Sequence, residues 1–172
     1  GTGSGIQAIT ANKNKPVREV VAVDINPQAV RELQQKVREK GFKKIIVRES
    51  DLFSAVTGKF DTIIFNPPYL PQDKGIVDQT LYGGKHGWEL SAKFLSEVSK
   101  YLIPDGKILF LFSTLTNKEK IEELIRENLL EYKKLVSQKL AWEELFVYQI
   151  EKSQVLRMLE SKGVEHINYL AH

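Results

Sequence analysis

A buried strand that leads directly into a helix is encoded by the stretch Arg18-Glu19-Val20-Val21-Ala22-Val23-Asp24-Ile25-Asn26-Pro27. The apolar run that ends at Asp24 is typical of a strand covered on both faces. Pro27 suits the first turn of a helix. Apolar residues then recur at helical spacing as far as Gly41, which can end that helix. The stretch therefore predicts one strand–helix unit of an α/β protein.

The same alternation continues along the chain. The pattern predicts further strands at 43–47, 60–65 and 107–112, the last entered by a turn at Pro104-Asp105-Gly106, and helices at 6–11, 88–101 and 117–128. Two later strands, 132–138 and 144–150, should pair antiparallel because no crossover helix separates them, and a helix at 153–162 follows. We expect a single domain over residues 1–172: a mostly parallel sheet with helices on both faces and a C-terminal antiparallel hairpin.

The composition excludes several classes of protein. With 42% hydrophobic and 27% charged residues, the 172-residue chain has the profile of a soluble globular protein. The absence of cysteine excludes disulfides and thiolate metal sites, and the three scattered histidines predict no metal. The apolar runs are too short for a membrane span and no signal peptide is recognisable, so we expect a cytoplasmic protein. A net charge of +3 permits contact with RNA or the ribosome without requiring it.

A nucleotide-type cofactor is indicated by two features at the predicted strand ends. Gly1-Thr2-Gly3-Ser4-Gly5 is a glycine-rich loop that allows a tight turn and a close approach of the backbone to a ligand. Asp24 closes the next strand, where its carboxylate could accept hydrogen bonds from a ribose diol. The alternative interpretations are an ordinary flexible turn for the loop and a helix cap for Asp24.

The glycine spacing favours S-adenosylmethionine over a dinucleotide. A dinucleotide fingerprint, G-x-G-x-x-G/A, needs a small residue where this chain has Ile6. Ser50-Asp51-Leu52-Phe53 follows the next strand, and the Asp51 carboxylate could accept a hydrogen bond from the adenine amine. Asp51 could also be an ordinary turn residue.

The most specific feature is Asn66-Pro67-Pro68-Tyr69, which directly follows an apolar strand. The two prolines stiffen the loop. The Asn66 amide oxygen and the Pro67 carbonyl could accept both hydrogens of a planar –NH₂ group, and Tyr69 could stack on that group. Such a clamp would raise the electron density on a poorly nucleophilic nitrogen and aim it at a methyl donor, so that positioning and electrostatics carry the catalysis. A rigid turn or a proline-rich ligand motif is the alternative interpretation.

Together these residues resemble the class I S-adenosylmethionine-dependent methyltransferases of the HemK/PrmC type. The glycine loop, Val23-Asp24-Ile25-Asn26, Asp51-Leu52-Phe53 and Asn66-Pro67-Pro68-Tyr69 carry the resemblance. Two later segments, Tyr82-Gly83-Gly84-Lys85-His86-Gly87-Trp88-Glu89 and Trp142-Glu143-Glu144-Leu145-Phe146-Val147, are also similar to the family. The resemblance implies a Rossmann-like fold and methylation of the glutamine amide in the Gly-Gly-Gln loop of translation release factors.

The resemblance also implies site residues and partners. The cofactor contacts would be Gly1, Thr2, Gly3, Gly5, Asp24, Ile25, Asp51, Leu52 and Asn66, and the acceptor clamp would be Asn66, Pro67, Pro68 and Tyr69. The short archaeal and eukaryotic branch usually works with a small zinc-binding activator subunit. His86 stands where the family often has Asp or Asn, and no role is assigned to it.

One departure concerns the start of the chain. The family has a strand ending in an acidic residue just before the glycine loop, and an N-terminal segment that covers the cofactor. This sequence begins at the loop itself, so we expect the domain to be N-terminally incomplete, with its first strand missing.

Two other functions remain open from the sequence. Asn-Pro-Pro-Tyr loops are also used on adenine N6 or guanine N2 of DNA or RNA, although base methylation calls for a basic phosphate-binding surface, and no dense Lys/Arg patch is evident. A non-catalytic subunit that keeps the fold without its activity is the alternative of another class. A non-catalytic subunit need not bind S-adenosylmethionine, so measured binding would argue against that alternative.

Overall fold

The computed structural model describes residues 1–72 and 81–164. The chain divides into two compact units, Gly1–Thr57 and Gly58–His172. The single-domain organisation stays a prediction. No helix in the described part of the chain is long and apolar enough to cross a membrane.

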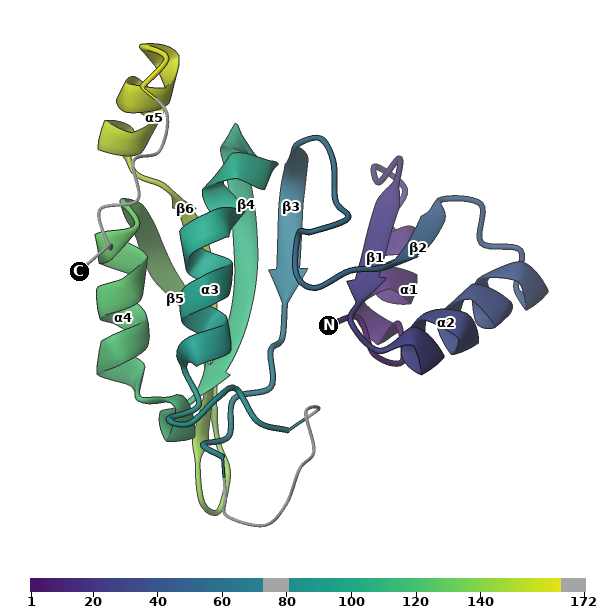
Figure 1. Ribbon diagram of the computed structural model, residues 1–172, viewed down its shortest axis with the longest axis horizontal. Helices are drawn as coiled ribbons and strands as arrows, with labels where there is room; N and C mark the ends of the chain where they lie inside the picture. Colours follow the sequence, from purple (N-terminus) through teal and green to yellow (C-terminus); the bar gives the residue numbers. More distant parts are fainter. Residues whose placement is uncertain (73–80, 165–172) are drawn as a thin grey trace. The chain divides into compact units, whose positions relative to one another are not determined.

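The first unit is a parallel strand pair with two helices. It contains α1 (Ile6–Asn12), β1 (Val20–Asp24), α2 (Pro27–Glu39) and β2 (Ile45–Glu49) (Figure 1). β1 and β2 pair in parallel, with Val20 opposite Ile45 and Asp24 opposite Glu49. The core of the unit joins both helices to both strands through Ala8, Ala22, Leu33 and Ile45. Burial of these apolar side chains holds the carboxyl ends of β1 and β2 side by side.

The second unit is a mixed four-stranded sheet in the order β3-β4-β6-β5. Its elements are β3 (Phe60–Phe65), α3 (Glu89–Val98), η1 (Ser99–Tyr101), β4 (Leu102–Ser113), η2 (Thr114–Thr116), α4 (Lys118–Glu127), β5 (Leu130–Lys139), β6 (Glu144–Lys152) and α5 (Gln154–Ser161). β3 and β4 are parallel, whereas β6 is antiparallel to both β4 and β5. This arrangement confirms the predicted C-terminal hairpin.

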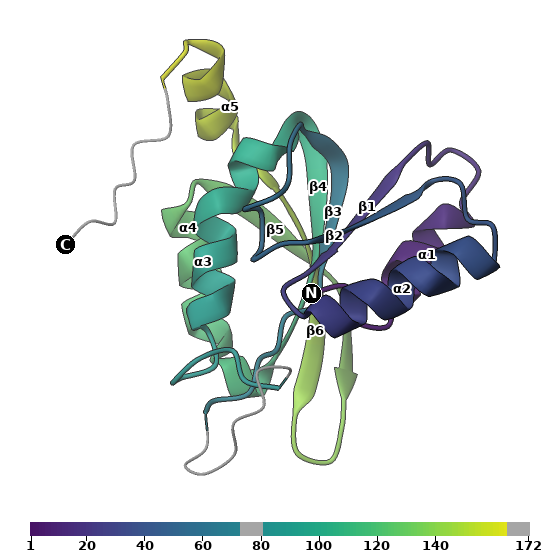
Figure 2. The same cartoon turned by 45° about the vertical axis from the view of Figure 1, so that its right-hand side comes forward.

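α3 and α4 lie next to each other over one face of this sheet (Figures 1 and 2). The contact is largely aromatic: Phe65 of β3 stacks on Phe94 of α3 at 4.2 Å between ring centroids, and Phe94 stacks on Phe110 of β4 at 5.9 Å. Alternate residues of β4 and β6 are buried beneath the helices, as the two-residue period of a strand requires. Helices on both faces of one sheet remain a prediction.

The predicted turn at Pro104–Gly106 is wrong as a strand boundary. β4 already begins at Leu102, and its pairing with β3 shifts register between Phe60, opposite Leu102, and Thr62, opposite Lys107. Pro104 and Gly106 therefore lie in an irregular stretch of strand, where a proline without a donor is tolerated. The residue types resemble those of a turn, which is why the pattern misleads.

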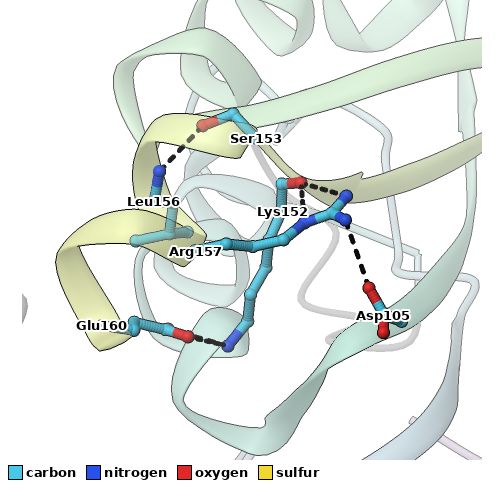
Figure 3. Close-up of polar contacts among 6 residues, drawn as sticks. All are labelled: Asp105, Lys152, Ser153, Leu156, Arg157 and Glu160. Carbon is cyan, nitrogen blue, oxygen red and sulfur yellow. Dashed lines mark hydrogen bonds and ion pairs between the residues drawn. The ribbon is translucent and has the colours of Figure 1, made fainter. Parts of the chain in front are cut away.

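Side chains cap the starts of α2, α4 and α5. Asn26, the residue before Pro27, caps α2: its side chain accepts a hydrogen bond from the Gln28 backbone N–H. Asn117 caps α4 in the same way by accepting one from the Lys120 backbone N–H. α5 is capped by Ser153 and attached to the sheet by the ion pair between Lys152 and Glu160 (Figure 3).

Candidate functional site

The glycine loop is folded against the end of β1. The Thr2 backbone N–H donates to the Val23 carbonyl at 2.8 Å, and the Gly5 N–H donates to the Thr2 carbonyl at 2.9 Å. Gly3 and Gly5 have φ values of 50° and 77°, in the left-handed region that favours glycine. A Cβ on Gly5 would overlap the Leu33 side chain, whereas one on Gly3 would meet nothing within 4 Å. Gly5 is thus needed for packing, and Gly3 leaves open space above the loop.

Asp24 ties this loop to the start of α2. One oxygen of its buried carboxylate accepts from the Gly3 N–H at 2.8 Å, and the other accepts from the Asn26 N–H at 2.9 Å. The helix cap is the side chain of Asn26, so the interpretation of Asp24 as the cap of α2 is wrong. Each carboxylate oxygen can accept more than one hydrogen bond, which leaves acceptor capacity for a ligand.

The segment after β2 lies beside Asp24. The Ser50 N–H donates to the Asp24 carbonyl at 2.9 Å, and the buried Ser50 hydroxyl donates to the Leu52 carbonyl at 2.9 Å. Leu52 has a φ of 48°, so the chain turns sharply there. Ile25, which follows Asp24, is 57% exposed and presents an apolar side chain. The structure therefore gathers the predicted cofactor contacts of the first unit at one edge of the β1–β2 pair.

The Asn66–Tyr69 loop begins where β3 ends, as the sequence predicts. The Asn66 side chain is exposed, and within residues 1–72 and 81–164 its amide has no hydrogen-bond partner. Pro67 is buried and Pro68 is half-buried. The Tyr69 hydroxyl donates to the Glu143 carboxylate at 3.5 Å. Burial, together with the negative charge of Glu143, raises the pKa of Tyr69.

The glycines of Gly83-Gly84-Lys85-His86-Gly87 allow this segment to lie directly on the loop. The Leu70 N–H donates to the Leu81 carbonyl and the Gly83 N–H donates to the Leu70 carbonyl, both at 3.0 Å. A Cβ on Gly83 would come 2.6 Å from the Pro68 carbonyl oxygen, and one on Gly87 would come 2.6 Å from the Tyr69 carbonyl oxygen. Side chains at these two positions would therefore push the loop away.

His86 has a structural contact that the sequence did not suggest. Its backbone N–H donates to the Glu89 carboxylate at 2.9 Å, and its ring Nδ1 lies 2.7 Å from the same carboxylate. Burial alone would raise the pKa of Glu89, but the hydrogen bonds from His86 and from the Glu89 backbone outweigh it and lower the pKa. The pair holds the segment to the first turn of α3.

Two further residues at the site were missed by the sequence analysis. Ser50 organises the turn that carries Asp51, and Glu143 contacts Tyr69 across the second unit. A serine after a strand is common on any surface. Glu143 lies in a segment that resembles the family, but nothing in the sequence indicates its contact with Tyr69. In the described part of the chain, no group of three His, Asp or Glu side chains is placed to hold a metal ion.

Comparison with known proteins gives the family. The model of the methyltransferase small domain matches residues 1–140. The chain is 42% identical over 130 residues to a putative protein N5-glutamine methyltransferase of Methanocaldococcus jannaschii, covering 72% of this chain and 65% of that protein. It is 30% identical over 118 residues to a release factor glutamine methyltransferase of Deinococcus radiodurans, covering 63% of this chain and 42% of that protein. The chain thus spans less than two thirds of the length of either relative.

A solved structure shows the same fold. The E. cuniculi Mtq2–Trm112 complex, described as responsible for methylation of the translation termination factor eRF1, aligns with a TM-score of 0.69. The alignment covers 88% of this chain and 81% of that chain at 21% identity. The fold is therefore the α/β fold of class I methyltransferases, and the match of the family model over most of the chain shows that this protein belongs to the methyltransferase small domain family.

Proposed function

We propose that this protein transfers the methyl group of S-adenosylmethionine to the side-chain amide nitrogen of a glutamine, in the Gly-Gly-Gln loop of a translation release factor. The observation that carries the proposal is the exposed Asn66 amide at the end of β3, which has no partner among the described residues and lies on a loop stiffened by Pro67 and Pro68. The family and the names of the two curated relatives support it.

The residues of the first unit fit the proposed cofactor. Asp24 retains acceptor capacity for the ribose hydroxyls, the open space above Gly3 lets the backbone approach a ligand, and exposed Ile25 offers an apolar contact for an adenine ring. Asp51 and Leu52 follow β2 at the same edge. When bound, S-adenosylmethionine supplies a methyl group on a sulfonium centre, which is electrophilic without help from a metal.

The residues of the acceptor loop have a positioning role. The Asn66 amide oxygen and the Pro67 carbonyl accept the two hydrogens of the substrate amide, which holds its –NH₂ group in the plane of the clamp. Both hydrogen bonds push electron density onto the nitrogen, and the face of Tyr69 supports the planar group. The proton lost from the nitrogen after transfer leaves to solvent, so no side-chain base is required.

The test is a labelling experiment with competing acceptors. The protein is incubated with methyl-labelled S-adenosylmethionine, a release factor and bulk RNA, with and without a small zinc-binding activator of the kind that the resemblance implies. The label should enter the release factor and be lost when the glutamine of its Gly-Gly-Gln loop is replaced. Label in RNA would replace the proposal with base methylation, and no binding of S-adenosylmethionine by calorimetry would indicate a non-catalytic subunit.

A further inference from the structure

Glu143 connects the acceptor loop to two other elements of the second unit. The residue lies in the turn of the β5–β6 hairpin, which Figures 1 and 2 place at the same end of the unit as the loop after β3. One oxygen of its carboxylate accepts from the Tyr69 hydroxyl at 3.5 Å, and the other accepts from the hydroxyl of Ser113 at the end of β4. A single side chain thus joins the ends of three strands.

The hairpin turn holds this carboxylate in a fixed place. The Leu140 N–H donates to the Glu143 carbonyl at 2.8 Å, which closes the turn, and the Glu144 N–H donates to the Thr114 hydroxyl at 3.0 Å. Ser113, fully buried, is paired with Leu145 across β4 and β6. The Glu143 side chain therefore extends from a backbone that is hydrogen-bonded on both sides and reaches a buried hydroxyl on a paired strand.

Tyr69 is held at its backbone as well as at its hydroxyl. The Thr116 hydroxyl donates to the Tyr69 carbonyl at 3.4 Å. With the hydroxyl bonded to Glu143, the ring is fixed at both ends, and the raised pKa of Tyr69 keeps the phenol protonated as the donor. A ring that is ordered before the acceptor arrives loses less conformational entropy when it stacks on a planar group.

We propose that Glu143 is a positioning residue that fixes the ring of Tyr69 for the incoming planar amide. Because this role concerns the acceptor loop, it rests on the proposed function. The distance between the Tyr69 hydroxyl and the Glu143 carboxylate is at the long end for a hydrogen bond, so this bond is weaker than a short charge-assisted one. We call it the tether, and its role is to align the ring.

A double-mutant cycle tests this role. The variants are Tyr69→Phe, Glu143→Ala and the two combined, assayed for methyl transfer to the release factor. Each single change should lower kcat/KM for the release factor by about tenfold, mainly through KM. The combination should lower it no further than Glu143→Ala alone, because that variant has already lost the Tyr69–Glu143 bond together with the Ser113–Glu143 bond. The affinity for S-adenosylmethionine, measured by calorimetry, should stay within about twofold of the wild type because neither residue is among the proposed cofactor contacts.

Two conservative changes separate positioning from folding. Glu143→Gln keeps one acceptor oxygen for one of the two hydroxyls, and its NH₂ group can donate to the oxygen of the other, so it should retain more transfer than Glu143→Ala. Glu144→Gln removes the same charge one residue later, from a side chain that does not touch Tyr69, and should behave as the wild type. Losses that add in the double variant, or an equal loss in Glu144→Gln, would overturn the role of Glu143.

A second readout does not depend on methyl transfer. The alkaline titration of Tyr69, taken as the difference in absorbance between the wild type and Tyr69→Phe, should shift toward lower pH in Glu143→Ala, because the negative neighbour has gone. If the wild type methylates no release factor, the proposed function fails while this titration still reports whether the tether exists. An unshifted titration would overturn the tether itself.

Discussion

Gly83 lies so close to the acceptor loop that a Cβ at this position would come 2.6 Å from the carbonyl oxygen of Pro68. Real Cβ atoms essentially never approach within 3.0 Å of another heavy atom. The opposing atom belongs to a backbone stiffened by two prolines, so it cannot rotate aside as a side-chain atom could. The absence of a side chain at Gly83 is therefore a condition for the position of Pro68.

Gly83→Ala should displace the acceptor loop without unfolding the protein. A shift of about 1 Å in a clamp that works by positioning can lower the rate about 100-fold. We expect methyl transfer to fall by that order, while calorimetry shows unchanged binding of S-adenosylmethionine. Gly58→Ala is the control, because Gly58 has a φ of 85° but nothing within 4 Å of its Cβ position. It should lose about 1–2 kcal/mol of stability from backbone strain and keep its rate. Equal rates in the two variants would contradict the packing argument.

The glycine loop gives a second pair of variants, this time for stability. A Cβ on Gly5 would overlap the buried side chain of Leu33 and lie 2.9 Å from its Cδ2, at a φ of 77°. Gly5→Ala should therefore combine backbone strain with overpacking of the core of the first unit, at a cost of about 2–4 kcal/mol. Denaturant unfolding measures the loss, and binding of S-adenosylmethionine should weaken with it.

Gly3→Ala provides the comparison for Gly5→Ala. Gly3 also has a positive φ, of 50°, but its Cβ position is open. Gly3→Ala should therefore introduce backbone strain without overpacking, so the unfolding free energy should fall by about 1–2 kcal/mol. A loss in Gly3→Ala as large as that in Gly5→Ala would show that Leu33 does not determine the identity of residue 5.

The attachment of α5 depends on a buried charge. The Lys152 side chain is fully buried, and its ammonium group lies 2.7 Å from the Glu160 carboxylate (Figure 3). Glu160→Gln removes the compensating charge, so an ammonium without a full counter-charge remains in the interior. Breaking such a pair costs about 3–5 kcal/mol when both partners are buried. Because the Glu160 side chain is 29% exposed, we expect a smaller loss, of about 2–3 kcal/mol in the free energy of unfolding, measured by urea denaturation.

The neighbouring ion pair is the control for this prediction. Arg157 bonds Asp105 at 3.2 Å, but the Asp105 side chain is 85% exposed, and Arg157 also donates to the Lys152 carbonyl (Figure 3). Asp105→Asn should leave the unfolding midpoint essentially unchanged, because an exposed pair in water contributes little. If both variants lost the same stability, burial would not be the reason for the strength of the Lys152–Glu160 pair.

The sequence predicts the elements better than their junctions. Hydrophobic periodicity and local signals such as Pro27 act over a few residues, so they place strands and helices within a few positions of where they are found. The stretch Pro104–Gly106 fails because its residues suit a turn, while pairing with β3 on both sides of it, at Leu102 and Lys107, makes it part of the strand. The conformation of this stretch is therefore set by tertiary strand pairing and not by the local propensity of its residues.

In the candidate site, too, the sequence predicts the residues that depend on local pattern and misses those that depend on tertiary contacts. Asn66 and Asp24 are recognisable because each directly follows an apolar strand, and strand ends are where such sheets bind ligands. Glu143 is not recognisable, since its partner Tyr69 is distant along the chain and only the fold brings them together. The requirement for glycine at position 83 is equally invisible, because it arises from two backbone carbonyls that the fold brings next to it, those of Gly87 and Pro68.

Asn66 offers the most direct test of the clamp. Its side chain is exposed and has no partner among residues 1–72 and 81–164, so Asn66→Ala should leave the unfolding free energy nearly unchanged. Loss of one pre-positioned hydrogen-bond acceptor for the amide should lower kcat for methyl transfer by about 100- to 1,000-fold. Asn66→Asp keeps an oxygen acceptor and should retain more activity than Asn66→Ala. Calorimetry should show that both variants still bind S-adenosylmethionine, because the proposed ribose and adenine contacts lie in the first unit. If Asn66→Ala instead lost cofactor binding and transfer together, the side chain would be supporting the structure, and the acceptor nitrogen would have to be held by other groups.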